Sequence, residues 1–87
     1  MQYILSKHCK DQMKLRGIHE NQVLQVLKKP EQTIKENACT TIYQSVIKSE
    51  NAKEYLFRIF VNTCIQPNIV ITVYRTSKIV KYHEDKI

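Results

Sequence analysis

The stretch EYLFRIFVNTCIQPNIVITVYRT, residues 54–76, decides the fold. It contains two runs rich in β-branched and aromatic residues, 54–61 and 68–76, joined by the short segment NTCIQP. Both runs are apolar on both sides of the strand alternation, which is typical of central strands. Because so short a connection favours antiparallel neighbours, the two runs are predicted to form the centre of an antiparallel sheet.

Two further strands precede this pair. The segments QTIKE, residues 32–36, and TIYQSVI, residues 41–47, also have a period of two, and NACT and KSENAK separate the strands. Short connections throughout favour a four-stranded antiparallel meander. A short strand at residues 3–5 is a further option.

The residues before the sheet indicate two helices. With Ser6 as N-cap, KHCKDQMKLR runs to Gly17, the only glycine, which stands where a positive φ closes a helix. The next segment, IHENQVLQVLKKP, carries an apolar stripe and ends before Pro30. If His19 is its N-cap, Gln22 occupies the capping-box position.

Length and composition agree with one α+β domain over residues 1–87, in which two N-terminal helices pack on the four-stranded sheet. Hydrophobic residues make up 43% and charged residues 25%, as in ordinary soluble domains. No stretch approaches the roughly 20 apolar residues of a membrane span. The N-terminus lacks the apolar region of a secretory signal, so a cytoplasmic location without a membrane partner is predicted.

The cysteine and glycine counts argue against several kinds of site. The three cysteines are far apart in sequence, and no C-x-x-C is present. We therefore expect neither a disulfide framework nor a metal site, and interpret the cysteines as small core or half-buried residues. A single glycine excludes a P-loop and a dinucleotide fingerprint, so no cofactor is predicted.

The net charge of +6 is concentrated at the two ends of the chain. Residues 1–30 hold six Lys and Arg against two acids, residues 31–71 hold four against four, and residues 72–87 hold four against two. If the two ends meet in space, they form one basic face suited to a polyanion. The alternative is that the lysines serve only solubility.

Arginines occur inside both central strands. Alternation places Arg75 on one face of the last strand and Tyr74 on the other. Arg58 lies within an otherwise hydrophobic strand, where an unpartnered guanidinium is costly. It therefore either pairs with an acid, such as Glu54 or Glu36, or points into a polar cleft.

Metal-free RNA cleavage can use such a set of side chains. A base removes the proton of the 2′-hydroxyl, cations stabilise the charge on the attacked phosphate, and an acid protonates the leaving oxygen. Histidine has the most suitable pKa for these proton transfers, and tyrosine or lysine needs a shifted one.

The segments SKHCKDQMKLRGIHENQVLQVLKKPEQ, residues 6–32, and IVITVYRTSKIVKY, residues 69–82, resemble the opening and closing segments of a family of small bacterial domains of unknown function. That family is similar to the RelE/BrnT-type toxins of toxin–antitoxin systems, which pack helices on an antiparallel sheet. The resemblance implies a metal-independent endoribonuclease toxin that acts on RNA, including ribosome-bound messenger RNA. It also implies an antitoxin that covers the basic face; a homodimer is a further option.

The candidate residues divide into two groups. The expected catalytic residues are Arg75, Arg58 and Lys78 for the scissile phosphate, and His8, Tyr74 or Tyr82 for proton transfer. The expected contacts to the RNA backbone are Lys7, Lys10, Lys14, Arg16 and Lys81. Two alternatives remain open: a non-catalytic module of the same fold that binds RNA or protein, and a structural domain whose arginines pair with glutamates.

Overall fold

The computed structural model describes residues 2–82, with the side chains of residues 2–80, and contains one sheet and three helices in that range. The chain order is β1 (Tyr3–Leu5), α1 (Lys7–Arg16), α2 (Glu20–Lys28), β2 (Gln32–Lys35), β3 (Thr40–Lys48), β4 (Glu54–Asn62), β5 (Asn68–Thr76) and the short α3 (Ile79–Tyr82). The two predicted N-terminal helices and the four predicted strands are confirmed.

The caps of both helices follow from the sequence. At the start of α1, the Ser6 hydroxyl accepts the backbone N–H of Cys9 at 3.0 Å. Gly17 ends that helix with φ 64°, in the left-handed region that glycine enters without steric penalty. His19 is the N-cap of α2, and the Gln22 side chain accepts the His19 backbone N–H at 2.9 Å. The predicted capping position of Gln22 is confirmed.

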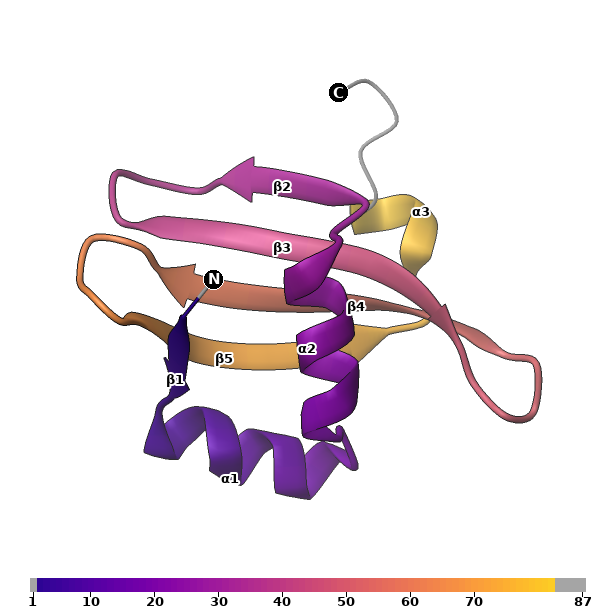
Figure 1. The fold of residues 1–87 in the computed structure, drawn as a ribbon. Coiled ribbons are helices and arrows are strands. Elements are labelled where there is room, and N and C mark those ends of the chain that lie inside the picture. The colour runs from indigo at the N-terminus through magenta and orange to yellow at the C-terminus, as the bar shows by residue number, and fades with distance from the viewer. Residues whose placement is uncertain (1, 83–87) are drawn as a thin grey trace.

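The predicted four-stranded antiparallel sheet is wrong, because the sheet has five strands in the order β1-β5-β4-β3-β2 and is mixed. The strands β2 to β5 form the expected antiparallel meander, but β1 adds to β5 in parallel, with Tyr3 opposite Asn68 and Leu5 opposite Val70 (Figure 1). The three residues of β1 find their partner more than sixty positions away, so no local pattern indicated this pairing.

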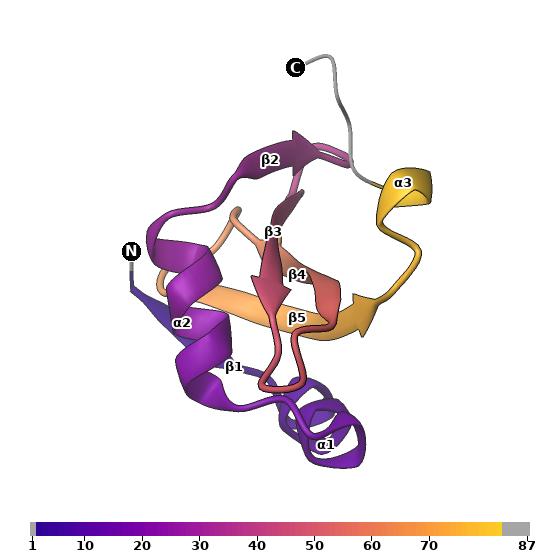
Figure 2. The same cartoon turned by 90° about the vertical axis from the view of Figure 1, so that its right-hand side faces the viewer.

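The core lies between the helices and one face of the sheet. Figure 2 shows the sheet between α2 on one side and α3 on the other, with α1 along the β5 edge. Alternate residues of β4 (Phe57, Ile59 and Val61) and Val73 of β5 pack against Val23, Val26 and other apolar side chains of α1 and α2. We call this the helix-covered face and the other the second face.

The edge of β5 beyond β1 is closed by α1. The Ser6 hydroxyl donates to the carbonyl of Ile71 at 3.1 Å, and Arg16 Nη1 donates to the carbonyl of Val73 at 2.8 Å. An open strand edge exposes unpaired backbone groups, and these two side chains occupy carbonyls of that edge. The basic helix and the basic last strand therefore lie side by side, which is the condition for the two charged ends of the chain to form one basic face.

The expectation of no disulfide is wrong for two of the three cysteines. Cys39, between β2 and β3, is bonded to Cys64, between β4 and β5. The pairing of Thr40 with Asn62 brings these two turns to the same end of the sheet, although 25 residues separate the cysteines in sequence. Cys9 is fully buried in the core, as predicted.

Candidate functional site

A row of four polar side chains crosses the second face of the sheet. Gln32, Gln44, Arg58 and Tyr74 lie directly opposite one another on β2, β3, β4 and β5. Gln44 Nε2 donates to Gln32 Oε1 at 2.6 Å, and Arg58 Nε donates to Gln44 Oε1 at 2.9 Å. Arg58 Nη1 then donates to the Tyr74 hydroxyl at 2.8 Å. This polar row holds a guanidinium and a phenol in fixed positions near the middle of the sheet.

Aromatic rings and a second arginine surround the Arg58–Tyr74 end of the polar row. The guanidinium of Arg58 lies 5.5 Å from the Phe60 ring centroid and 5.8 Å from that of Tyr74. Arg16, from the end of α1, lies 6.0 Å from the Tyr74 ring, and the Phe60 and Tyr74 rings stack at 6.0 Å. Two cations and two aromatic faces therefore gather at one place, a combination that suits phosphates and unstacked bases.

The structure separates the two arginines of the central strands. Arg58 and Tyr74 share the second face, whereas Arg75 pairs in register with Phe57 on the helix-covered face. The predicted split between Tyr74 and Arg75 is confirmed. Arg75 and Arg58 are therefore not brought to a single phosphate position. The Arg58 side chain donates hydrogen bonds to Gln44 and to Tyr74, which are both neutral side chains.

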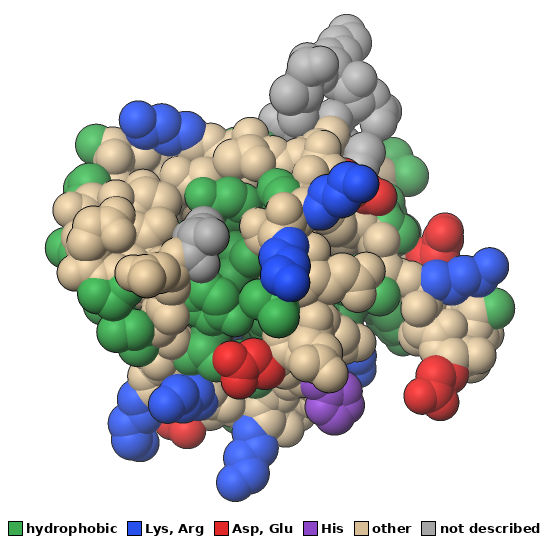
Figure 3. Space-filling model, viewed as in Figure 1, with side chains coloured by type: hydrophobic (Ala, Val, Ile, Leu, Met, Phe, Trp, Pro, Cys, Tyr) green, Lys and Arg blue, Asp and Glu red, His purple; other side chains and the backbone are tan. Residues whose placement is uncertain are grey.

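The other predicted residues lie around these two positions. Four of them are exposed on α1, namely Lys7, His8, Lys10 and Lys14. Lys7 pairs with Asp11 at 3.6 Å. Lysines project from this helix along the lower edge of the molecule in Figure 3. Lys78 is exposed just after β5. The side chains of Lys81 and Tyr82 lie outside the part of the chain that the structure describes.

The helical geometry separates His8 from the polar row. Arg16, at the other end of α1, touches the Tyr74 ring. Eight residues at about 1.5 Å each put His8 about 12 Å farther along the helix axis. Within the described residues, no three His, Cys, Asp or Glu side chains gather closely enough to hold a metal ion.

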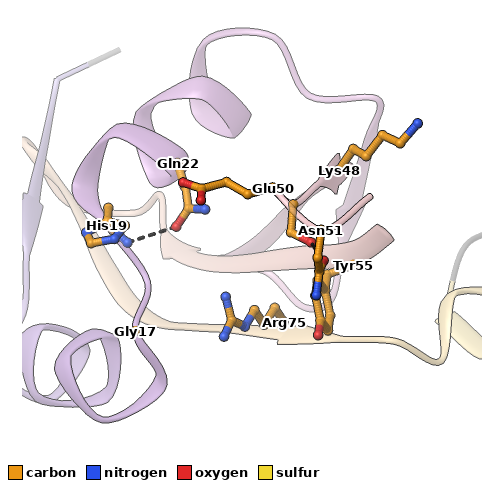
Figure 4. A pocket seen from close by; sticks show the side chains of 9 residues that line it. Gly17, His19, Gln22, Lys48, Glu50, Asn51, Tyr55 and Arg75 are labelled. Atoms are coloured by element: carbon orange, nitrogen blue, oxygen red, sulfur yellow. Dashed lines mark hydrogen bonds between the residues drawn. The ribbon is translucent and has the colours of Figure 1, made fainter. Parts of the chain in front are cut away.

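Arg75 faces a hollow at the opposite side of the sheet. This notch, about 510 Å³ in volume, is bounded by the α1–α2 corner, the β3–β4 hairpin and the end of β5 (Figure 4). Its lining residues are Gly17, His19, Gln22, Lys48, Ser49, Glu50, Asn51, Tyr55 and Arg75.

Several residues of both places were not singled out from the sequence. Gln44 and Phe60 become noticeable only once strand register puts them beside Arg58. Glu50 and Tyr55 belong to the β3–β4 hairpin, which lines the same notch as the start of α2 although the two segments are far apart in sequence. The alternation of β4 was the one available signal, since it already placed Phe60 on the same face as Arg58.

Comparison with known proteins gives a family assignment. Residues 5–75 match the family described as "Domain of unknown function (DUF4258)". The chain belongs to this family. No curated protein matches the chain, and no solved structure does either. The match covers both N-terminal helices and ends at Arg75, so the family assignment includes the polar row and every residue that lines the notch.

Along the described residues, no helix has the length and apolar character required to cross a membrane.

Proposed function

We propose that this domain is a metal-independent endoribonuclease of the toxin type, with the Arg58–Tyr74 pair at its centre. The observation that supports this function best is the 2.8 Å hydrogen bond from the Arg58 guanidinium to the Tyr74 hydroxyl, with Arg16 against the same ring. A phenol and two guanidinium groups that contact its ring thus lie together, and they can supply one of the two proton transfers and the charge stabilisation that cleavage by the 2′-hydroxyl needs.

The reaction assigned to this site is an internal transesterification. The 2′-hydroxyl loses its proton as its oxygen bonds to phosphorus, the bond from phosphorus to the 5′-oxygen breaks, and that oxygen gains a proton. The products are a 2′,3′-cyclic phosphate and a 5′-hydroxyl. Arg58 and Arg16 stabilise the charge on the non-bridging oxygens, and Tyr74 takes part in one of the two proton transfers. His8 is too far along α1 to be its partner in the same step.

The surrounding charge fits an extended RNA substrate. The exposed lysines of α1 (Lys7, Lys10 and Lys14) continue from Arg16 along the β5 edge, where they neutralise backbone phosphates. The remaining parts of the proposal rest on the resemblance of the opening and closing segments to a family that is itself similar to RelE/BrnT-type toxins. These parts are messenger RNA on the ribosome as a target, an antitoxin that covers the basic face, and action in the cytoplasm.

The test is cleavage of an end-labelled RNA oligonucleotide by the purified chain, in EDTA without ribosomes and in magnesium buffer with ribosomes. We expect cleavage that leaves a cyclic phosphate, and a loss of about 100-fold or more in rate for Tyr74→Phe. Arg58→Gln should lose activity as well. Lys35→Ala, an exposed lysine of β2, is the matched control and should cleave normally.

Thermal unfolding of each variant separates lost chemistry from lost structure, since Arg58 also bonds Gln44. The proposal is wrong if the folded wild-type chain leaves RNA intact under both conditions and its induced expression does not slow growth.

A non-catalytic module that binds RNA or protein is the second candidate. It is favoured by the bond from Arg58 Nε to buried Gln44, which gives the arginine a structural role. In that case fluorescence anisotropy would show RNA binding that weakens steeply with salt, without product, and Tyr74→Phe would leave the binding nearly unchanged.

A further inference from the structure

The notch around Arg75 is separate from the polar row. The polar row belongs to the second face of the sheet, whereas the notch opens on the helix-covered face, beyond the core (Figure 4). Its volume of about 510 Å³ is in the range of small-molecule sites. Three segments far apart in sequence form it, so it exists only in the folded chain.

Arg75 supplies the notch with a cation that no acidic side chain of the described residues neutralises. Its guanidinium lies 5.0 Å from the centroid of the Tyr55 ring, and Lys53 lies 5.5 Å from the same ring. Among the described residues, Arg75 makes no ion pair. The aromatic contact orients the guanidinium and leaves its N–H groups for an external anion, and a phosphate matches their forked geometry.

The notch also contains an acid and an amide. Figure 4 shows Arg75 and Glu50 pointing into the hollow from different sides, whereas the ammonium group of Lys48 points away. Gln22 also lines the notch and uses its side-chain oxygen to accept the His19 backbone N–H. A carboxylate repels a simple anion. The ligand that satisfies both sides therefore carries a phosphate at one end and hydrogen-bond donors at the other.

The hairpin that carries Glu50 is held in shape by its own contacts. The Ser49 hydroxyl donates to the backbone carbonyl of Lys53 at 2.8 Å and also bonds the Asn51 side chain. Asn51 Oδ1 accepts the Lys53 backbone N–H at 3.1 Å. These bonds fix the loop without a ligand, which reduces the ordering that binding requires.

We propose that the notch binds a nucleoside monophosphate, with its phosphate on Arg75 and the base edge on Glu50. Guanine is the base that fits best, because N1–H and the 2-amino group present two adjacent donors to one carboxylate. The Tyr55 ring, which the Arg75 guanidinium contacts, forms an aromatic wall beside the phosphate end. The phosphate is held by a side chain, so the absence of a glycine-rich loop is no obstacle. This inference does not depend on RNA cleavage at the polar row.

Calorimetric titration of the full chain with GMP, UMP, guanosine and inorganic phosphate tests the proposal. GMP is expected to bind, and each of the other three to bind at least about tenfold more weakly, since each lacks one of the charge-assisted contacts. Arg75→Gln should weaken GMP about tenfold or more and leave guanosine unchanged. Glu50→Gln should bring the affinities of GMP and UMP together.

Two further variants separate this proposal from the proposed function. Tyr74→Phe should retain GMP affinity while it slows RNA cleavage, and Lys35→Ala should alter neither. Arg75 and Glu50 are both exposed, so their variants are expected to fold, and thermal unfolding checks this. The proposal is overturned if GMP gives no binding at millimolar concentration, if Arg75→Gln binds GMP as wild type does, or if phosphate alone binds as tightly as GMP.

Discussion

Burial in the core determines how readily the Cys9 thiol ionises. The side chain is fully buried in the core, with its sulfur 3.8 Å from that of Met13. Burial raises the pKa of the Cys9 thiol from its ordinary value of 9.0 to about 11, because the thiolate cannot be solvated there. The residue is therefore a neutral packing group and a poor nucleophile near neutral pH.

This pKa makes stability fall in alkaline solution. Above pH 9 the thiol ionises in the unfolded chain but not in the folded one, so the unfolded state binds fewer protons and is favoured as pH rises. The stabilisation is fully present below pH 9 and is lost between about 9 and 11. By pH 10 we expect a loss of about 1 kcal/mol, measured by urea unfolding at pH 7, 9 and 10.

Cys9→Ala is the control for this titration. It will lower stability at every pH, because it leaves a cavity, but its stability should decline less between pH 9 and 10 than that of wild type. The pKa of Tyr3 is also raised, by burial first and by Glu20 second, so measurements stop at pH 10, before that phenol contributes strongly. Parallel pH profiles for the two chains would contradict the assignment.

At the scale of elements, the β3–β4 hairpin combines an unusual backbone conformation with several of the residues that line the notch. In its turn Ala52 has φ 67°, a left-handed backbone conformation that residues with a Cβ atom rarely adopt. The bonds among Ser49, Asn51 and Lys53 hold the turn in this shape. The position of Glu50 over the notch therefore depends on a locally unfavourable backbone conformation.

Ala52→Gly is expected to stabilise the protein. Glycine removes the steric clash of the Cβ atom, and this gain in free energy exceeds the cost of the greater chain entropy of the unfolded state. The free energy of unfolding should therefore rise by about 0.5 kcal/mol. Denaturant unfolding measures the change. Ala38→Gly is the matched control: it is also exposed in a turn, but its φ is not positive, so it should be neutral or destabilising. Equal effects of the two substitutions would show that the Ala52 backbone is not strained.

For the whole molecule, the two ends of the sheet are organised differently. The disulfide between Cys39 and Cys64 joins the β2–β3 and β4–β5 turns at one end. The β3–β4 hairpin and the α1–α2 corner lie at the other end (Figure 1), and no disulfide joins them in the described residues. Residues of both segments line the notch. The bonded end thus constrains the central meander, while both candidate sites depend on strand pairing and side-chain contacts.

Reduction of the disulfide should lower global stability. Closing a loop of 25 residues restricts the unfolded chain, and its loss is expected to reduce the free energy of unfolding by about 3 kcal/mol. Thermal or urea unfolding with and without dithiothreitol measures this. In the double variant Cys39→Ser, Cys64→Ser the reductant should have no effect. Identical unfolding of the oxidised and reduced wild-type chain would exclude a stabilising bond.

The sequence by itself determined the elements: the two helices with their caps, the four strands of the meander and the opposite faces of Tyr74 and Arg75. These depend on side-chain period and on residues a few positions apart, which a linear pattern contains.

Only the tertiary structure decided the parallel addition of β1, the Cys39–Cys64 bond, the polar row and the notch. Each of these features joins residues that strand register or helix packing brings together. The residues are too far apart in sequence for a local hydrophobic pattern to predict their contact. The same reason explains why the arginines, all visible as candidates in the sequence, were not assigned to their separate sites. A residue's type and face are local properties, but its neighbours are a property of the folded chain.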